Sequence, residues 1–213
     1  MKKILLIGTT LLLLTACQTA YYSAMEKVGV HKRDILVDRV EAAKESQEES
    51  QKQFQSSLEH LSALINFDGG ELQSVYEQLN DDYIASESAA KDVSNRINKV
   101  EDVATALFDE WETELEQYQS ATLKRESQKK LSATQRQFSK LLRSMRKSET
   151  KMAPVLAALK DNSLYLKHNV NAQAISAIKG EFTNLKRDIQ SLIKDMNNSI
   201  LDSNKFIEQM HQG

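Results

Sequence analysis

The sequence predicts an all-α protein, an elongated antiparallel helical bundle with coiled-coil character and about four long helices. Three observations support this fold class. Proline occurs once and glycine six times in 213 residues, so few positions interrupt helices. Aromatic residues make up only 6% of the chain, whereas a sheet favours β-branched and aromatic runs. Apolar residues recur at intervals of three and four over long stretches, which is the spacing of one helix face.

The first long helix is expected at about residues 33–66, and Gly69 and Gly70 then interrupt the pattern. Its apolar stripe has a polar gap at residues 47–51. We interpret this gap as a weakly packed section of the bundle. A similar section is expected at residues 199–203 of the last helix. A partner helix or a second copy of the chain would add stability at such places.

The other helices are expected at about residues 71–119, 125–160 and 171–211. Pro154 lies inside the third predicted helix, where its ring removes one backbone donor and clashes one turn back. We therefore expect a kink or a break at this proline. Turn residues at 161–163 and 169–171 mark the connection to the last helix.

Charge predicts how the second and third helices are connected, since no glycine or proline separates Tyr118 from Leu131. Residues 68–116 hold 14 acidic and 3 basic residues, whereas residues 124–151 hold 10 basic and 2 acidic ones. A hairpin that folds back near Ser120 lays these blocks side by side, and each exposed pair adds up to about 1 kcal/mol. We therefore predict a hairpin. The alternative is one continuous helix of about eighty residues, ~120 Å long.

A basic stripe on the third predicted helix is the most distinctive local feature. Its members recur at intervals of three, four and seven and so share one side of the helix. They are Arg125, Lys129, Arg136, Lys140, Arg143, Lys147 and Lys151. The stripe would suit an anionic phospholipid, a polyanionic glycan or an acidic partner. The alternative is neutralisation by the acidic second helix, with Arg136 near Asp109 and Arg143 near Glu101.

The first seventeen residues have the features of a secretory signal. Lys2 and Lys3 precede an apolar run that is too short to remain as a bilayer-spanning helix. The closing residues Leu14-Thr15-Ala16-Cys17 resemble the lipobox of bacterial lipoproteins, in which the cysteine is lipidated and becomes the new N-terminus. Cys17 is the only cysteine, and lipidation accounts for an odd thiol in an exported protein.

The chain therefore divides into a signal peptide at 1–17, a short membrane-proximal segment at 18–32 and a helical bundle at 33–213. Aromatic and basic side chains near the anchor suit the headgroup region of a bilayer. The candidates for such contact are Tyr21, Tyr22, Lys27, Lys32 and Arg33. Ordinary packing at the start of a helix is the alternative interpretation, and Gly29 is expected to interrupt this segment.

Composition and spacing argue against several functional classes. Without the signal, 26 basic residues face 30 acidic ones, which is not the balance of a globally basic nucleic-acid binder. The histidines do not stand at the spacings of metal ligands, so neither a metal site nor a cofactor is expected. They are His31, His60, His168 and His211. No nucleophile and base can be paired, and we do not expect an enzyme.

Three stretches of the chain carry a family resemblance. They are YYSAMEKVGVHKRDILV at 21–37, VSNRI at 93–97 and VATALFDEW at 103–111. These stretches resemble the DUF2959 family of gammaproteobacterial proteins of uncharacterised function, and the similarity extends over essentially the whole mature chain. The resemblance implies a helical architecture with coiled coil, and it carries over no catalytic or binding residue.

These features predict a lipid-anchored periplasmic protein that acts as a structural or interaction scaffold. An envelope protein or a second copy of the chain is the expected partner, and nucleic acid is not. Gln18 follows the lipidated cysteine, where Asp would favour retention in the inner membrane. The expected location is thus the periplasmic side of the outer membrane of a Gram-negative bacterium. The alternative function is a chaperone-like or ligand-holding bundle that uses the basic helix.

Overall fold

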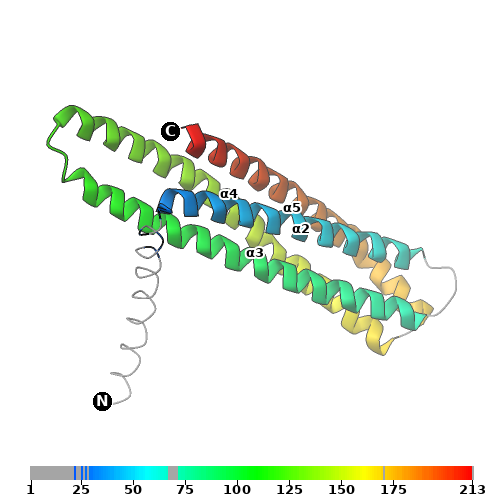
Figure 1. The fold of residues 1–213 in the computed structure, drawn as a ribbon. Coiled ribbons are helices and arrows are strands. Elements are labelled where there is room, and N and C mark those ends of the chain that lie inside the picture. Colours follow the sequence, from blue (N-terminus) through cyan, green and yellow to red (C-terminus); the bar gives the residue numbers. More distant parts are fainter. Residues whose placement is uncertain are drawn as a thin grey trace, which may run out of the picture.

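The computed structural model describes residues 22, 25, 27, 29–66, 72–169 and 171–212. These residues form four long helices and no strand (Figure 1). The helices are α2 (Lys32–Ile65), α3 (Leu72–Leu115), α4 (Ala121–His168) and α5 (Ala172–Gln212). The predicted fold class, a helical bundle without a sheet, is therefore confirmed.

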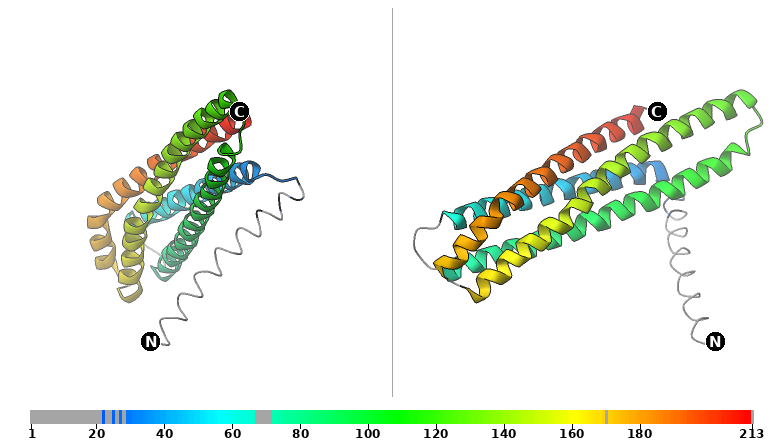
Figure 2. Two further views of the ribbon diagram at one scale, coloured as in Figure 1. Left: turned by 90° about the vertical axis from the view of Figure 1, so that its left-hand side faces the viewer. Right: turned by 180° about the vertical axis from the view of Figure 1, so that it is seen from behind.

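The helices pack side by side, and successive ones run in opposite directions (Figures 1 and 2). α2 packs against α3 and α5, and α4 packs against the same two helices. The apolar stripes predicted from the sequence meet along this bundle. Phe138 of α4 illustrates the core, because its ring lies edge-on to Phe108 of α3 at 5.6 Å and to Phe206 of α5 at 6.0 Å.

The predicted hairpin between α3 and α4 is confirmed. The last turn of α3 tightens, since the Gln117 N–H donates to the Glu114 carbonyl at 2.9 Å. Ser120 then caps α4, because its hydroxyl accepts from the Leu123 N–H at 3.4 Å. The turn thus falls where the charge blocks of the sequence change sign.

α3 and α4 continue beyond the ends of α2 and α5 and form a projecting arm (Figure 2). α2 begins at Lys32, whose ammonium group binds Glu110 of α3 at 2.9 Å. The guanidinium of Arg33 donates to the Met210 carbonyl near the end of α5. We define the arm as residues 111–135, the part of the hairpin past this level, since Gln135 of α4 donates to Glu112 of α3 at 2.9 Å.

The break predicted at Pro154 is wrong. α4 runs on through this proline to His168, and residues 161–163, predicted as a turn, lie inside the helix. The reason is burial on both sides, since Met152 and Val155 are only 2% and 1% exposed. Ending the helix at Pro154 would expose this stripe, and each apolar side chain contributes about 1.5–3 kcal/mol by burial.

The turn predicted at 169–171 is confirmed at its described residues. The Asn171 N–H donates to the Asn169 carbonyl at 2.8 Å. The Asn171 side chain then accepts from the Gln173 and Ala174 N–H groups at 3.0 and 3.1 Å, which caps the start of α5. The break predicted at Gly69 and Gly70 lies outside the described residues.

The polar sections of α2 and α5 lie inside the bundle. Gln47, Ser50, Ser199 and Ser203 are each 0% exposed. Gln47 Nε2 donates to Ser148 Oγ at 2.9 Å and so joins α2 to α4. The Ser203 hydroxyl donates to the Ser199 carbonyl within α5. The inward positions of these sections are therefore polar and closed to bulk solvent.

Candidate functional site

The structure divides the basic stripe of α4 into two sets, and the first set faces α5. Asp202 of α5 lies 3.1 Å from Lys140 Nζ. Asp195 binds Lys147 at 2.8 Å and Lys151 at 2.5 Å. Neutralisation of the stripe by α3 is thus wrong for these three lysines, since their acidic partners are on α5.

A spacing in the sequence matches this arrangement. Asp195 and Asp202 are seven residues apart, as are Lys140 and Lys147, so each pair occupies equivalent positions two turns apart along its helix. In an antiparallel pair of helices the two ladders meet. We predicted pairing with the second helix because it has many more acidic residues than α5. The matching spacing of Asp195 and Asp202 was therefore overlooked.

An ion pair joins α4 to the acidic helix α3 through Arg146, which is not a member of the stripe. Its guanidinium binds Glu101 at 2.5 Å and also bonds Asn98 at 2.8 Å. The predicted register placed Arg143 at Glu101 and is therefore wrong by three residues. Packing of Phe108 against Phe138 fixes the register, and the charges follow from it.

The second set of the stripe lies on the solvent face of α4. We call it the cationic row, which comprises Arg125, Lys129, Arg136 and Arg143. All four side chains are exposed. Lys129 pairs with Glu126, which is also exposed, at 2.9 Å. Among the residues that the structure describes, no carboxylate lies within ion-pair distance of Arg125, Arg136 or Arg143.

Two shallow grooves of about 390 and 560 Å³ follow the cationic row. Their walls are polar along the whole length, with Ser132 shared by both grooves and Ser139 beside Arg143. Guanidinium groups bind carboxylate and phosphate with paired hydrogen bonds, and hydroxyl groups can complete such contacts. This surface is chemically suited to an extended anionic partner.

Asp195 is held by two lysines of the basic stripe, Lys147 and Lys151. Burial acts to raise its pKa, but hydrogen bonds and charges from Lys147 and Lys151 outweigh that effect and hold the pKa of Asp195 below its ordinary value. The carboxylate therefore stays ionised and keeps both lysines directed toward α5.

A cavity of about 330 Å³ lies at the base of the arm, where all four described helices contribute to its lining. We call it the junction cavity. Leu107, Trp111 and Met210 supply apolar walls, and Arg33 and Lys130 supply charge. The Trp111 indole N–H donates to Ser127 Oγ at 2.8 Å, so its ring is fixed between the two helices of the arm.

The candidates for membrane-proximal contact differ in their surroundings. Tyr22 is 8% exposed and packs in the core, with Lys32 Nζ 5.9 Å from the centre of its ring. Lys32 and Arg33 bind Glu110 and the Met210 carbonyl, as described above. These contacts are those of ordinary helix-start packing. Lys27 is exposed. Tyr21 and the lipidation candidate Cys17 lie outside the described residues.

The turn before α2 depends on Gly29. Its φ is 83°, and the Val30 N–H donates to the Met25 carbonyl at 3.0 Å. This is the bond pattern of a helix end with glycine in the left-handed conformation. The predicted interruption at Gly29 is therefore confirmed, and the turn holds Tyr22 against the bundle.

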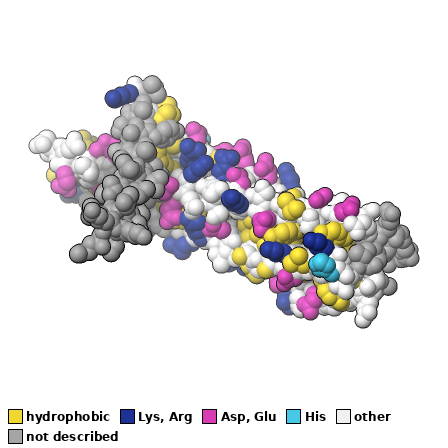
Figure 3. Space-filling view, turned by 90° about the horizontal axis from the view of Figure 1, so that it is seen from below, with side chains coloured by type: hydrophobic (Ala, Val, Ile, Leu, Met, Phe, Trp, Pro, Cys, Tyr) yellow, Lys and Arg dark blue, Asp and Glu magenta, His cyan; other side chains and the backbone are white. Residues whose placement is uncertain are grey.

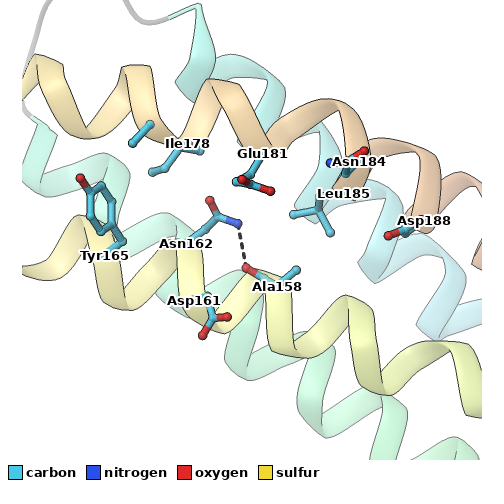
Figure 4. A pocket seen from close by; sticks show the side chains of 10 residues that line it. Ala158, Asp161, Asn162, Tyr165, Ile178, Glu181, Asn184, Leu185 and Asp188 are labelled. Carbon is cyan, nitrogen blue, oxygen red and sulfur yellow. Dashed lines mark hydrogen bonds between the residues drawn. The ribbon is translucent and has the colours of Figure 1, made fainter.

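An acidic groove of about 530 Å³ lies between α4 and α5 near the end opposite the arm (Figure 4). Asp161, Glu181 and Asp188 surround a floor that includes Ile178 and Leu185. Its acidic groups are exposed to solvent. The groove differs in sign from the cationic row, because Glu181 and Asp188 of α5 join Asp161 of α4 there.

Apolar side chains gather toward the same end of the molecule in Figure 3. The large exposed apolar residues of that end are Ile84, Leu164 and Tyr165, with 52%, 47% and 42% exposure. Within the described part of the chain, no helix is apolar over a length that could cross a bilayer. The same residues contain no group of three or more His, Cys, Asp or Glu arranged to hold a metal ion.

Fold and surface together define the chain as an all-helical antiparallel bundle with a projecting hairpin arm. It belongs to the DUF2959 family, whose model, described as a protein of unknown function, matches residues 21–210. The family resemblance found in the sequence is thereby confirmed over nearly the whole chain. No curated protein and no solved structure matches it.

Proposed function

We propose that this chain is a lipid-anchored envelope protein that acts as a scaffold or adaptor. In this proposal Cys17 carries the lipid and fixes the protein to the periplasmic side of the outer membrane. The sequence of residues 1–17 supports the anchor, and the long bundle supports a binding rather than a catalytic role.

The observation that carries the interaction role is the cationic row. Arginine side chains that meet no carboxylate within the described chain remain available to a partner. Arg136 and Arg143 lie seven residues apart, about 10 Å along the helix. An acidic protein segment or an anionic glycan of the envelope could contact both at once. Because the row is exposed, charge steers the encounter, and binding should weaken with added salt.

Replacement of the row tests this role. In Arg136→Glu/Arg143→Glu, binding of the anionic partner should fall at least tenfold, while helicity stays unchanged because neither side chain is paired. The measurement is in-cell crosslinking and affinity capture of the full-length lipoprotein, scored by the amount of partner recovered. Lys91→Glu/Lys99→Glu is the matched control, since it makes the same charge change at exposed positions of α3.

If the row variant recovers as much partner as the control, the cationic row is not the binding surface. If both variants lose the partner, only net charge matters and no specific surface exists. Lys140 and Lys147 are unsuited to this test, because replacing them would break pairs with α5.

The junction cavity favours a second candidate, a ligand-holding or chaperone-like bundle. Its apolar walls at Leu107, Trp111 and Met210 could accept an apolar group, and Arg33 and Lys130 could hold an attached anion. In that case Trp111 fluorescence would change when a ligand binds, since it is the only tryptophan in the chain.

A further inference from the structure

The tip of the arm, residues 116–125, exposes apolar side chains beside cations. Two large apolar side chains are exposed on the two sides of the turn, Tyr118 at 41% and Leu123 at 59%. Lys124 and Arg125 follow directly on α4. An amphipathic aromatic ring, an aliphatic side chain and cations in one small region suit the headgroup layer of a bilayer.

The position of the tip can be compared with that of the anchor. Tyr22 is fixed against the bundle beside Lys32, at the base of the arm. Only four residues separate it from Cys17, and the five Cα–Cα steps between the two residues span at most about 18 Å. Tyr22 must therefore lie within this distance of a membrane that holds the lipid.

The arm is about as long as the extended segment between Cys17 and Tyr22. From Thr134, which lines the junction cavity, to the start of α4 at Ala121, the helix rises ~20 Å at 1.5 Å per residue. If the end of the bundle with the arm faces the membrane, the tip must reach the bilayer. The segment between Cys17 and Tyr22 is no longer than the arm, so it cannot hold the tip away from the surface.

We propose that the tip of the arm rests in the headgroup layer of the membrane that holds Cys17, so that the bundle stands end-on. This inference rests on the proposed lipid anchor. The occupant of the tip is a phospholipid surface, reached by Tyr118 and Leu123 and bordered by Arg125. The end with Ile84, Leu164 and the acidic groove then faces away from the membrane.

Acidic side chains of the arm do not oppose this contact strongly. Glu116 pairs with Lys124 at 3.2 Å, and Glu126 pairs with Lys129 at 2.9 Å. Glu112 accepts a hydrogen bond from Gln135 at 2.9 Å. The remaining acid of the arm, Glu114, lines the junction cavity. The four acids are balanced by four cations, Lys124, Arg125, Lys129 and Lys130, so the net charge of the arm is zero and the apolar pair at the tip supplies most of the attraction.

A polarity-sensitive fluorophore on a single cysteine tests the proposal in the full-length lipoprotein. Lipidation consumes the thiol of Cys17, so Leu123→Cys provides the one free thiol. The protein is reconstituted into vesicles of phosphatidylethanolamine and phosphatidylglycerol. We expect a blue-shifted emission and several-fold stronger quenching by spin-labelled lipids than in the controls. Tyr118→Cys gives an independent probe on the other side of the turn.

The controls are Leu201→Cys and Ile84→Cys, whose native side chains are 55% and 52% exposed, much like Leu123. Leu201 lies on α5, eleven residues before its last residue, and Ile84 lies on α3, twelve residues after its first residue. Water-like emission at both tip probes would overturn the proposal. An equal response at Leu201 would overturn it as well, because the bundle would then lie flat on the bilayer.

Lipidation of Cys17 is measured separately from the contact of the tip. Incorporation of labelled fatty acid at Cys17 and flotation with the vesicles establish the proposed lipid attachment. If Cys17 carries fatty acid but the tip probes show water-like emission, the arm does not contact the membrane and the proposed anchored scaffold is unaffected. Absence of fatty acid at Cys17 removes both proposals.

Discussion

Single buried acids decide which cations remain available on α4. Asp195 is 6% exposed and holds two lysines of the basic stripe, so these side chains are not free for a partner. Arg136 and Arg143 have no such acid within the described residues and stay directed to solvent. A stripe that is uniform in sequence thus becomes two functionally different surfaces.

Asp195→Asn should lower the free energy of unfolding by about 1–2 kcal/mol at pH 7. Lys147 is 64% exposed, and solvent screening keeps the loss at this modest size. The folded pKa of Asp195 is depressed, so its contribution is present above the unfolded value of 3.8 and is lost as pH falls through the folded value. Denaturant unfolding from pH 7 to pH 2 measures it, with the two proteins converging at low pH. A constant difference across this range would contradict the assignment.

At the scale of elements, α4 is held together by its contacts with other helices more than by its local sequence. It contains a proline and a turn-like stretch at 161–163, yet it continues for 48 residues. Residues on both sides of Pro154 are buried against the bundle, and their packing outweighs the missing backbone bond. The helix therefore carries a local cost that a substitution can remove.

Pro154→Ala should raise the free energy of unfolding by about 1–3 kcal/mol, because alanine restores the backbone donor in a helix interior. Pro154 itself is exposed, so little packing is lost. Greater freedom of the unfolded chain offsets part of the gain, by up to about 1 kcal/mol. Thermal and urea unfolding measure the change, and Ala153→Ser serves as the neighbouring exposed control. Unchanged or lower stability would mean that α4 tolerates the proline without cost.

For the whole molecule, the hairpin sets the overall length. α4, the longest described helix, has 48 residues and so spans ~72 Å. An end-on bundle of this length would place its far end well away from the membrane surface. The alternative topology, one fused helix across residues 71–160, would be much longer.

Small-angle X-ray scattering should give a maximum dimension of about 80 Å for a soluble form that lacks residues 1–17. A value near 120 Å would indicate the fused helix. Light scattering on the same sample gives the mass, which separates a longer monomer from an end-to-end dimer. A monomer that captures no partner in cells would contradict the scaffold role.

The sequence by itself determined the helices, their antiparallel order and the hairpin between α3 and α4. Apolar periodicity and net charge along a segment are local properties, so a linear chain displays them. The bundle predicted from this periodicity is therefore the one observed, and Leu36, Ile97 and Ile189 of its apolar stripes are fully buried.

Only the tertiary structure decided which charges meet, how far the arm projects and whether α4 continues past Pro154. Each depends on the register between helices, which the core fixes through contacts such as Phe108 with Phe138 and Phe138 with Phe206. A shift of three residues in this register replaces Arg143 by Arg146 at Glu101 and leaves Arg143 facing solvent. Periodicity repeats along a helix and cannot by itself distinguish such registers, whereas close packing of large side chains selects one of them.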